Sequence, residues 1–122
     1  MEEFKPQFKY EKLQIWQKAM DFGEEIFRLS ATFPKEEQYN LTSQARRAAD
    51  SIALNIAEGA ISQSNPEFKK FVGYAVRFLA EVLTCLEKAK RREYLSQDRF
   101  RQLYADAFHL MNMMQSFKSK IN

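Results

Sequence analysis

Apolar residues recur every three or four positions along four segments of this chain, which is the spacing of one face of an α-helix. The first segment runs from about residue 10 to residue 32, and its two apolar stripes are wider than one core-facing side requires. The others run from about residue 41 to 60, from 66 to 92 and from 97 to at least 117. Pro34 ends the first segment, because the residue before a proline is pushed out of the α region.

The breaks between these segments contain residues that typically begin helices. Asn40 or Thr42 is expected to cap the second helix by accepting a hydrogen bond from a free backbone N–H group. Asn65 is expected to cap the third helix, with Pro66 at the first helical position, where the missing N–H group costs nothing. Ser96 is the expected cap of the fourth helix.

Linkers of only a few residues make sequential helices run antiparallel as neighbours. No segment alternates cleanly between apolar and polar residues, as a strand would, and the chain has only three glycines and three prolines. The sequence therefore predicts an all-α fold, an antiparallel up-down-up-down four-helix bundle. The bundle is expected over residues 10–122 as a single domain, after an irregular segment over residues 1–9.

Few residues suit catalysis or metal binding. His109 is the only histidine, and one histidine without a cysteine or carboxylate at metal spacing is a poor ligand set. Cys85 lies beside the apolar stripe of the third helix, where a small buried residue is expected. Glycine-rich phosphate loops, nucleophile elbows and paired-carboxylate motifs are absent from the sequence. We expect no enzymatic activity, no metal and no cofactor.

The single cysteine and the N-terminal sequence bear on the compartment. One cysteine rules out an internal disulfide and suits a reducing environment. The first residues lack the layout of a signal peptide, and no apolar run approaches the ~20 residues needed to cross a bilayer. These features predict a cytoplasmic protein with no membrane attachment.

A polar stripe on the second helix is the most informative pattern in the chain. Its members share one side of the helix because they recur at helical spacing, next to five alanines that let neighbouring helices approach. They are Arg47, Ser51, Asn55 and Glu58. We interpret the last three as a polar seam that fixes assembly, because buried polar groups need partners. The expected partners are Arg47 of a neighbouring subunit or the Trp16 indole, and a ligand-binding surface is the alternative.

Charge is unevenly distributed, although the net charge is only +3. Residues 1–61 carry eight Lys and Arg against ten Asp and Glu, whereas residues 62–122 carry eleven against six. In the predicted topology the end of the third helix meets the starts of the second and fourth. That end gathers the candidate phosphate-binding residues Arg46, Arg47, Lys88, Lys90, Arg91, Arg92, Arg99 and Arg101. A structural role is the alternative, since cations at a helix C-terminus also favour the helix dipole.

Several of the same segments carry a resemblance to a known family. Its residues extend over nearly the whole chain: Trp16, Ala19, Phe33-Pro34, Tyr39, Leu41, Gln44, Arg46-Arg47-Ala48-Ala49, Ser51-Ile52, Asn55-Ile56-Ala57-Glu58-Gly59, Phe68, Phe71, Glu81, Ala89 and Tyr94-Leu95. On these residues the chain resembles the 23S rRNA intervening-sequence proteins, which are bacterial four-helix bundle proteins.

The resemblance implies a cytosolic bundle that assembles as a barrel-like homopentamer. It also implies a loose link to RNA, because such proteins are often encoded within insertions in 23S rRNA genes. A related group serves as accessory proteins of reverse transcriptases. The family implies no enzymatic activity.

This chain departs from the family pattern at three places. Asn40 stands where glycine is usual, and the turn is expected to persist because asparagine tolerates a left-handed conformation. Val76-Arg77-Phe78 replaces a small Gly-Ser pair on the third helix, a change expected to alter close contact between subunits. Glu93 replaces the glycine before Tyr94.

These observations predict a non-enzymatic, self-assembling scaffold that binds RNA or an RNA-handling protein through the basic end of the oligomer. Repeating a modest basic patch around a ring strengthens its hold on a polyphosphate chain. The alternative is a protein-interaction adaptor, for example a reverse-transcriptase accessory protein, without direct nucleic-acid binding.

Overall fold

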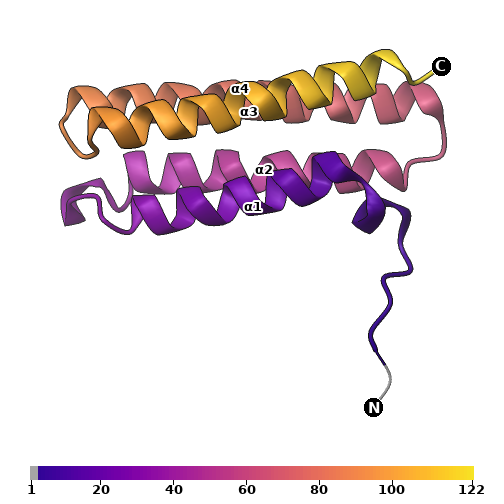
Figure 1. Cartoon of the computed structure of the whole chain (residues 1–122), viewed down its shortest axis with the longest axis horizontal. Coiled ribbons are helices and arrows are strands. Elements are labelled where there is room, and N and C mark those ends of the chain that lie inside the picture. Colours follow the sequence, from indigo (N-terminus) through magenta and orange to yellow (C-terminus); the bar gives the residue numbers. More distant parts are fainter. Residues whose placement is uncertain (1–2) are drawn as a thin grey trace.

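The structure, a computed structural model that describes residues 3–122, is an antiparallel bundle of four α-helices (Figure 1). The helices are α1 (Gln14–Ser30), α2 (Leu41–Ala60), α3 (Asn65–Arg91) and α4 (Gln97–Ser119). Each helix packs against its neighbours in the chain, and α4 closes the ring against α1. Over the described residues no strand occurs. The predicted all-α, up-down-up-down four-helix bundle is confirmed.

The first helix begins later than the sequence pattern predicts. Residues Lys9–Lys12 form a short 3-10 turn (η1), and the extended backbone of Leu13 separates this turn from α1. The turn is held against α1 by the Gln17 side chain, which donates to the Glu11 carbonyl at 2.9 Å. Residues 3–8, before η1, extend away from the bundle (Figure 1).

Small residues on α2 allow the close packing of α2 against α3. Gly59 shows this most clearly, because a Cβ atom there would lie 2.9 Å from side-chain atoms of both Phe68 and Phe71. Four alanines are buried nearer the start of the same helix, Ala45, Ala48, Ala49 and Ala53, and the last two line the side of α2 that faces α1. Bulkier apolar side chains fill the centre of the bundle, among them Ile26, Leu41, Ile52, Ile56, Leu79, Leu86, Leu103 and Met114.

The caps of α3 and α4 are serines. Ser64, one residue before the predicted cap Asn65, accepts a hydrogen bond from the Glu67 N–H at 3.3 Å. Asn65 is instead the first residue of the helix, and the proline that follows is the second. Ser96 caps α4 as predicted, accepting from the Arg99 N–H at 3.1 Å.

Candidate functional site

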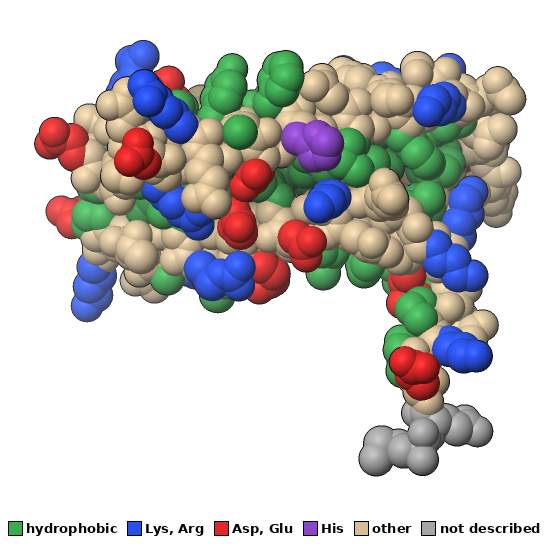
Figure 2. Space-filling model, viewed as in Figure 1, with side chains coloured by type: hydrophobic (Ala, Val, Ile, Leu, Met, Phe, Trp, Pro, Cys, Tyr) green, Lys and Arg blue, Asp and Glu red, His purple; other side chains and the backbone are tan. Residues whose placement is uncertain are grey.

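Positive charge is concentrated at one end of the bundle, where the α1–α2 and α3–α4 turns lie (Figure 1). Residues 28–47 and 87–101, which form this end, carry ten Lys and Arg against five Asp and Glu. Their net charge is +5, so the rest of the chain carries −2. Figure 2 shows at its left that the cations and carboxylates are interspersed there. We call this region the basic end.

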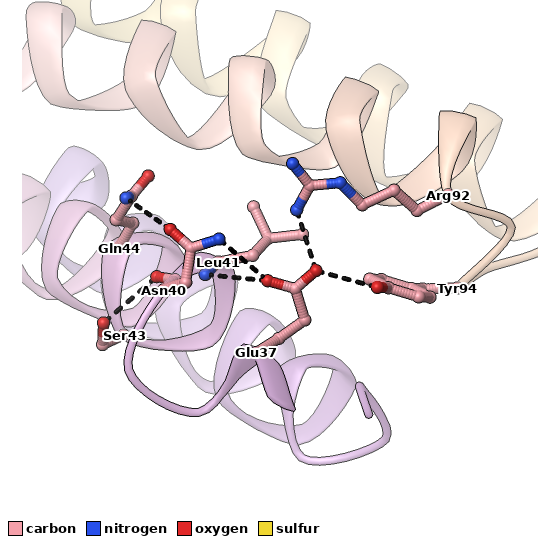
Figure 3. A network of polar contacts seen from close by, with 7 residues as sticks. All are labelled: Glu37, Asn40, Leu41, Ser43, Gln44, Arg92 and Tyr94. Atoms are coloured by element: carbon pink, nitrogen blue, oxygen red, sulfur yellow. Dashed lines mark hydrogen bonds and ion pairs between the residues drawn. The ribbon is translucent and has the colours of Figure 1, made fainter. Parts of the chain in front are cut away.

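A buried carboxylate links the two turns of the basic end (Figure 3). Glu37, only 6% exposed, lies at the end of the 3-10 turn η2 (Lys35–Glu37). Its Oε2 atom accepts from Arg92 Nη1 and from the Tyr94 hydroxyl, both at 2.8 Å. Its Oε1 atom accepts from the Asn40 side-chain amide at 3.0 Å and from the Leu41 N–H at 3.4 Å.

Asn40 occupies the N-cap position of α2, as one of the two predictions has it, but its side chain accepts from no backbone N–H group of the helix. Its amide nitrogen donates to Glu37, and its Oδ1 atom accepts from the Gln44 side-chain amide at 3.2 Å. Thr42, the other candidate, lies inside the helix. Glu37 takes the capping role, because a carboxylate at a helix N-terminus satisfies a free N–H group and favours the helix dipole. The turn also needs no left-handed residue at this position, since Asn40 has φ −131°.

The contacts around Glu37 shift two pKa values in opposite directions. The hydrogen bond from Tyr94 is the main cause that lowers the pKa of Glu37, helped by Leu41, Asn40 and Arg92 and opposed by burial. The same hydrogen bond raises the pKa of Tyr94, because the hydroxyl must keep its proton to donate. Arg92 is thus bound to an internal carboxylate.

Arg46 is also engaged within the chain. Its Nε donates to the Ser30 hydroxyl at 2.8 Å, and its Nη2 donates to the Phe27 carbonyl at 3.2 Å. The guanidinium group lies 4.1 Å from the centroid of the Phe27 ring. Arg46 therefore closes the C-terminal turn of α1, where its charge complements the helix dipole.

Two more of the predicted cations share one carboxylate. Lys90 and Arg91 lie 3.2 Å and 3.5 Å from Glu87 Oε2. Lys90 also lies over the Phe100 ring, 4.3 Å from its centroid. The Arg91 side chain is 79% exposed, and an exposed pair of this kind contributes little to stability, so Arg91 stays available to a ligand.

The remaining four candidates make no ion pair with any residue that the structure describes: Arg47, Lys88, Arg99 and Arg101. Arg99 Nη1 donates to the Gln102 side chain at 2.8 Å. Arg47 and Lys88 line the same groove between α2 and α3. The basic end thus combines engaged cations with cations that lack a carboxylate partner in residues 3–122.

The polar stripe of α2 forms hydrogen bonds to its own helix. The Ser51 hydroxyl donates to the Arg47 carbonyl at 2.8 Å, and the Asn55 amide donates to the Ser51 carbonyl at 2.7 Å. Glu58 is exposed. The expected bond to the Trp16 indole is not formed within residues 3–122. The seam between subunits stays a prediction.

Two grooves follow α2, one on each side. The α1–α2 groove encloses about 450 Å³, and its lining is mainly apolar: Tyr10, Trp16, Ala19, Met20, Gly23, Glu24, Ala49, Asp50, Ala53, Leu54 and Ala57. The α2–α3 groove encloses about 430 Å³, and polar and charged side chains share its lining with apolar ones: Gln44, Arg47, Ala48, Ser51, Phe78, Glu81, Thr84, Cys85 and Lys88. Sequence reasoning identified the polar stripe but missed both grooves, because each needs residues from two helices.

The residues considered for catalysis do not form a reactive site. His109 is exposed on the α1–α4 side of the bundle, beside Asp106 and Glu25 (Figure 2). Nevertheless, no cluster of His, Cys, Asp or Glu in residues 3–122 is arranged to hold a metal ion. Cys85 is 7% exposed, and burial raises the pKa of its thiol, which makes it a poor nucleophile.

Comparison with known proteins identifies the family. Residues 11–116 match the family described as 23S rRNA-intervening sequence protein. The chain belongs to this family. Its fold is also that of a protein of unknown function from the S23 ribosomal protein family of Bacteroides thetaiotaomicron, with 22% identity and a TM-score of 0.80. That alignment covers 87% of this chain and 96% of the other.

Neither the family description nor that of the Bacteroides protein names a reaction. No curated protein matches the chain. None of the helices within residues 3–122 has the length and apolar character needed to traverse a bilayer.

The structure shows where two departures from the family pattern lie, Glu93 and the pair Arg77-Phe78. Glu93 has φ 62°, a left-handed conformation that favours glycine, and it ends α3 so that the Tyr94 N–H can donate to the Ala89 carbonyl at 2.8 Å. Arg77 is exposed on α3, whereas Phe78 lines the α2–α3 groove. The first departure strains a turn of this 23S rRNA-intervening sequence protein, and the second changes the lining of a groove.

Proposed function

We propose that this chain is a binding scaffold, without chemistry of its own, that assembles from several copies and holds RNA at its basic end. The observation that carries the proposal is the segregation of charge, +5 on the basic end and −2 on the rest of the chain. A phosphate backbone releases counterions when such a surface binds it, which supplies affinity without sequence recognition.

The cations of the basic end differ in how well they suit this role. Arg91 and Arg101 are exposed, and neither is used to hold the fold together. Lys88 and Arg47 lack a carboxylate partner within residues 3–122, and both line the adjoining groove. We therefore assign the phosphate contacts to these residues and to Arg99, and we give Arg46 and Arg92 a structural role.

Assembly is supported by apolar surface that a lone bundle leaves exposed. On the α1–α2 groove Leu54 is 61% exposed, and the floor consists of small residues. On α4, Tyr104 and Phe108 are 51% and 58% exposed and lie one helical turn apart. These two aromatic side chains complement the small residues that line the α1–α2 groove.

We therefore propose that α4 of one copy docks in the α1–α2 groove of the next. These two surfaces are different, so the contact is heterologous, and such contacts close into rings when the rotation between copies allows it. A ring would repeat the basic end once per copy, which raises the affinity for a long polyanion through avidity.

The test is a fluorescence-anisotropy titration of labelled RNA at several salt concentrations, with the mass of the protein measured in parallel. We expect the logarithm of the affinity to fall linearly with the logarithm of the salt concentration. Arg91→Glu with Arg101→Glu should weaken binding and reduce the slope by about one for each phosphate that the variant no longer binds.

A matched control changes the same charge elsewhere. Lys69→Glu with Lys70→Glu alters the net charge equally, on exposed residues at the opposite end of α3. RNA binding should persist in this control. Equal losses in the two variants would show that binding follows net charge and not the basic end, and no binding by the wild type at low salt would remove RNA from the proposal.

A protein-interaction adaptor is the second candidate, and the α1–α2 groove favours it. Its apolar lining suits the apolar stripe of a partner helix as well as it suits a second copy of this chain. A monomeric mass at micromolar concentration, combined with no affinity for RNA, would favour the adaptor over the RNA scaffold.

A further inference from the structure

The α2–α3 groove has a polarity that the proposed function does not explain. α2 and α3 run antiparallel, so Gln44 and Lys88 lie at the mouth of the groove next to the basic end, and Phe78 lies at the far end. Along α3 the lining residues Lys88, Glu81 and Phe78 are separated by about 10 Å and then about 5 Å of helix axis. The groove therefore changes from cationic to aromatic along its length.

Each part of the groove suits a different part of a nucleotide. Lys88 and Arg47 make no ion pair within residues 3–122, so a phosphate can lie between them. Phe78 is half-buried at the far end of the groove. A base attached to a phosphate at the mouth of the groove would reach its aromatic ring and could stack on it. The carboxylate of Glu81 only accepts hydrogen bonds, so it suits a base edge that carries an amino group.

The two hydroxyl groups that line the groove already donate hydrogen bonds within their own helices. The Ser51 hydroxyl donates to the Arg47 carbonyl, and the Thr84 hydroxyl donates to the Ala80 carbonyl at 3.0 Å. Both hydroxyl protons are thus used within the helices. The volume of about 430 Å³ lies within the range of small-molecule sites, which fits one nucleotide better than a duplex.

We propose that the α2–α3 groove binds a single unpaired nucleotide of the RNA, with an amino-bearing base stacked on Phe78 and its phosphate between Arg47 and Lys88. This inference rests on the proposed function, because the rest of the strand lies on the basic end. It makes the protein a reader of unpaired RNA and not of helical RNA, since a paired base cannot enter the groove.

The test compares single-stranded adenine RNA of about twelve nucleotides, uracil RNA of the same length and an RNA duplex. The decisive variant is Phe78→Leu, which keeps an apolar side chain at a half-buried position but removes the aromatic face. We expect about tenfold weaker binding of the adenine strand and no change for the duplex. Phe4→Leu is the matched control, an exposed phenylalanine of the N-terminal segment that does not line the groove.

A second readout is independent of affinity. An adenine strand that carries one 2-aminopurine base loses fluorescence when that base stacks, so the wild type should quench it and Phe78→Leu should not. Glu81→Gln replaces a carboxylate, which only accepts hydrogen bonds, with an amide, which both donates and accepts. This variant should show a smaller preference for adenine over uracil. Circular dichroism confirms that each variant remains helical.

The outcomes separate this inference from the proposed function. If wild-type protein binds RNA but Phe78→Leu leaves every affinity and the quenching unchanged, the groove assignment is overturned and the scaffold proposal stands. Equal weakening of adenine strand and duplex also overturns it, because Phe78 would then not act through an unpaired base. If wild-type protein binds no RNA at low salt, the proposed function fails first.

Discussion

The two flanks of α2 differ sharply although they belong to one helix. Toward α1 the helix presents Ala49, Ala53 and Ala57 with the exposed Leu54. Toward α3 it presents Gln44, Arg47 and Ser51. The volumes of the two grooves are nearly equal, about 450 and 430 Å³. Size therefore does not separate them, but chemistry does.

This difference teaches how a small bundle carries two kinds of contact on one element. An apolar flank is stabilised by any complementary apolar surface, whereas a polar flank keeps its hydrogen-bonding groups in water until a matched ligand arrives. We accordingly assign the α1–α2 groove to a copy of the same chain and the α2–α3 groove to a nucleotide. Substitutions on either flank test that division, beginning with the one of largest expected effect.

Leu54→Glu places a carboxylate on the apolar flank. If the α1–α2 groove receives another copy, self-association should weaken by about thirtyfold or more, as expected when a central interface residue is removed. The free energy of unfolding should change by less than about 0.5 kcal/mol, because Leu54 is 61% exposed. Light scattering over a range of concentrations measures the first quantity, and urea unfolding measures the second.

Gln44→Glu is the matched control, since it adds one carboxylate to the other flank of the same helix. Assembly should be unaffected in this variant. Loss of assembly in Asn55→Leu, with Leu54→Glu still assembled, would assign the contact between copies to the polar stripe instead.

Glu37→Gln weakens the hydrogen-bond network at the basic end, in which Glu37 links the start of α2 to the end of α3. An amide supplies one acceptor atom where the carboxylate supplies two, so two of the four donors lose their partner. We expect a lower melting temperature, measured by circular dichroism. An unchanged melting temperature would show that the network contributes nothing to stability.

The same network predicts how stability depends on pH. The pKa of Glu37 is lower in the folded chain than its ordinary 4.5, so its contribution is complete above pH 4.5 and is lost as the pH falls through the folded pKa. The pKa of Tyr94 is raised above its ordinary 10.0, so its contribution to stability is complete below pH 10 and is lost as the pH rises through the folded pKa. Glu37→Gln should flatten the acid side of the melting-temperature profile.

Gly23→Ala separates stability from assembly. An added Cβ would meet only the Ala49 carbonyl, at 3.9 Å, so α1 should gain about 1 kcal/mol from better helix propensity. The methyl group also fills the floor of the α1–α2 groove, so assembly should weaken. Gly73→Ala is the control, because its Cβ approaches only the end of Lys118, at 3.4 Å, and it should stabilise without affecting assembly.

Glu93→Gly should have the smallest effect. Glycine relieves the left-handed conformation at φ 62° but has more freedom in the unfolded chain, which leaves a net gain of about 0.5 kcal/mol. Glu93→Ala removes the same charge without relieving the backbone. Urea unfolding should therefore rank glycine above alanine at this position, and the reverse order would show that charge and not backbone strain is decisive.

The sequence predicted the bundle because long periodic segments with short linkers permit few other arrangements. It also predicted that the cations gather at one end, since helix order alone dictates this. It did not predict which cations are engaged. Glu37 and Arg92 are 55 residues apart, and nothing local in the acidic turn indicates that this carboxylate is buried.

The errors in the caps have a similarly local cause. Ser64 and Asn65 are both good capping residues, and a displacement of one residue decides which of them accepts the hydrogen bond. The polar stripe was recognised from its spacing, but the residues that complete its groove come from α3. Phe78 carried no signal in the sequence beyond its departure from the family pattern.

α2 has three distinct sides, a core face, an apolar flank toward α1 and a polar flank toward α3, and this limits how its length can vary. Inserting one residue into an α-helix rotates everything beyond it by about 100°. In α2 such a rotation would move the apolar flank toward the core and the core face, with Ile52 and Ile56, toward a groove. Point substitutions can tune either groove separately, whereas a single insertion or deletion in the middle of α2 would disturb the core and both grooves together.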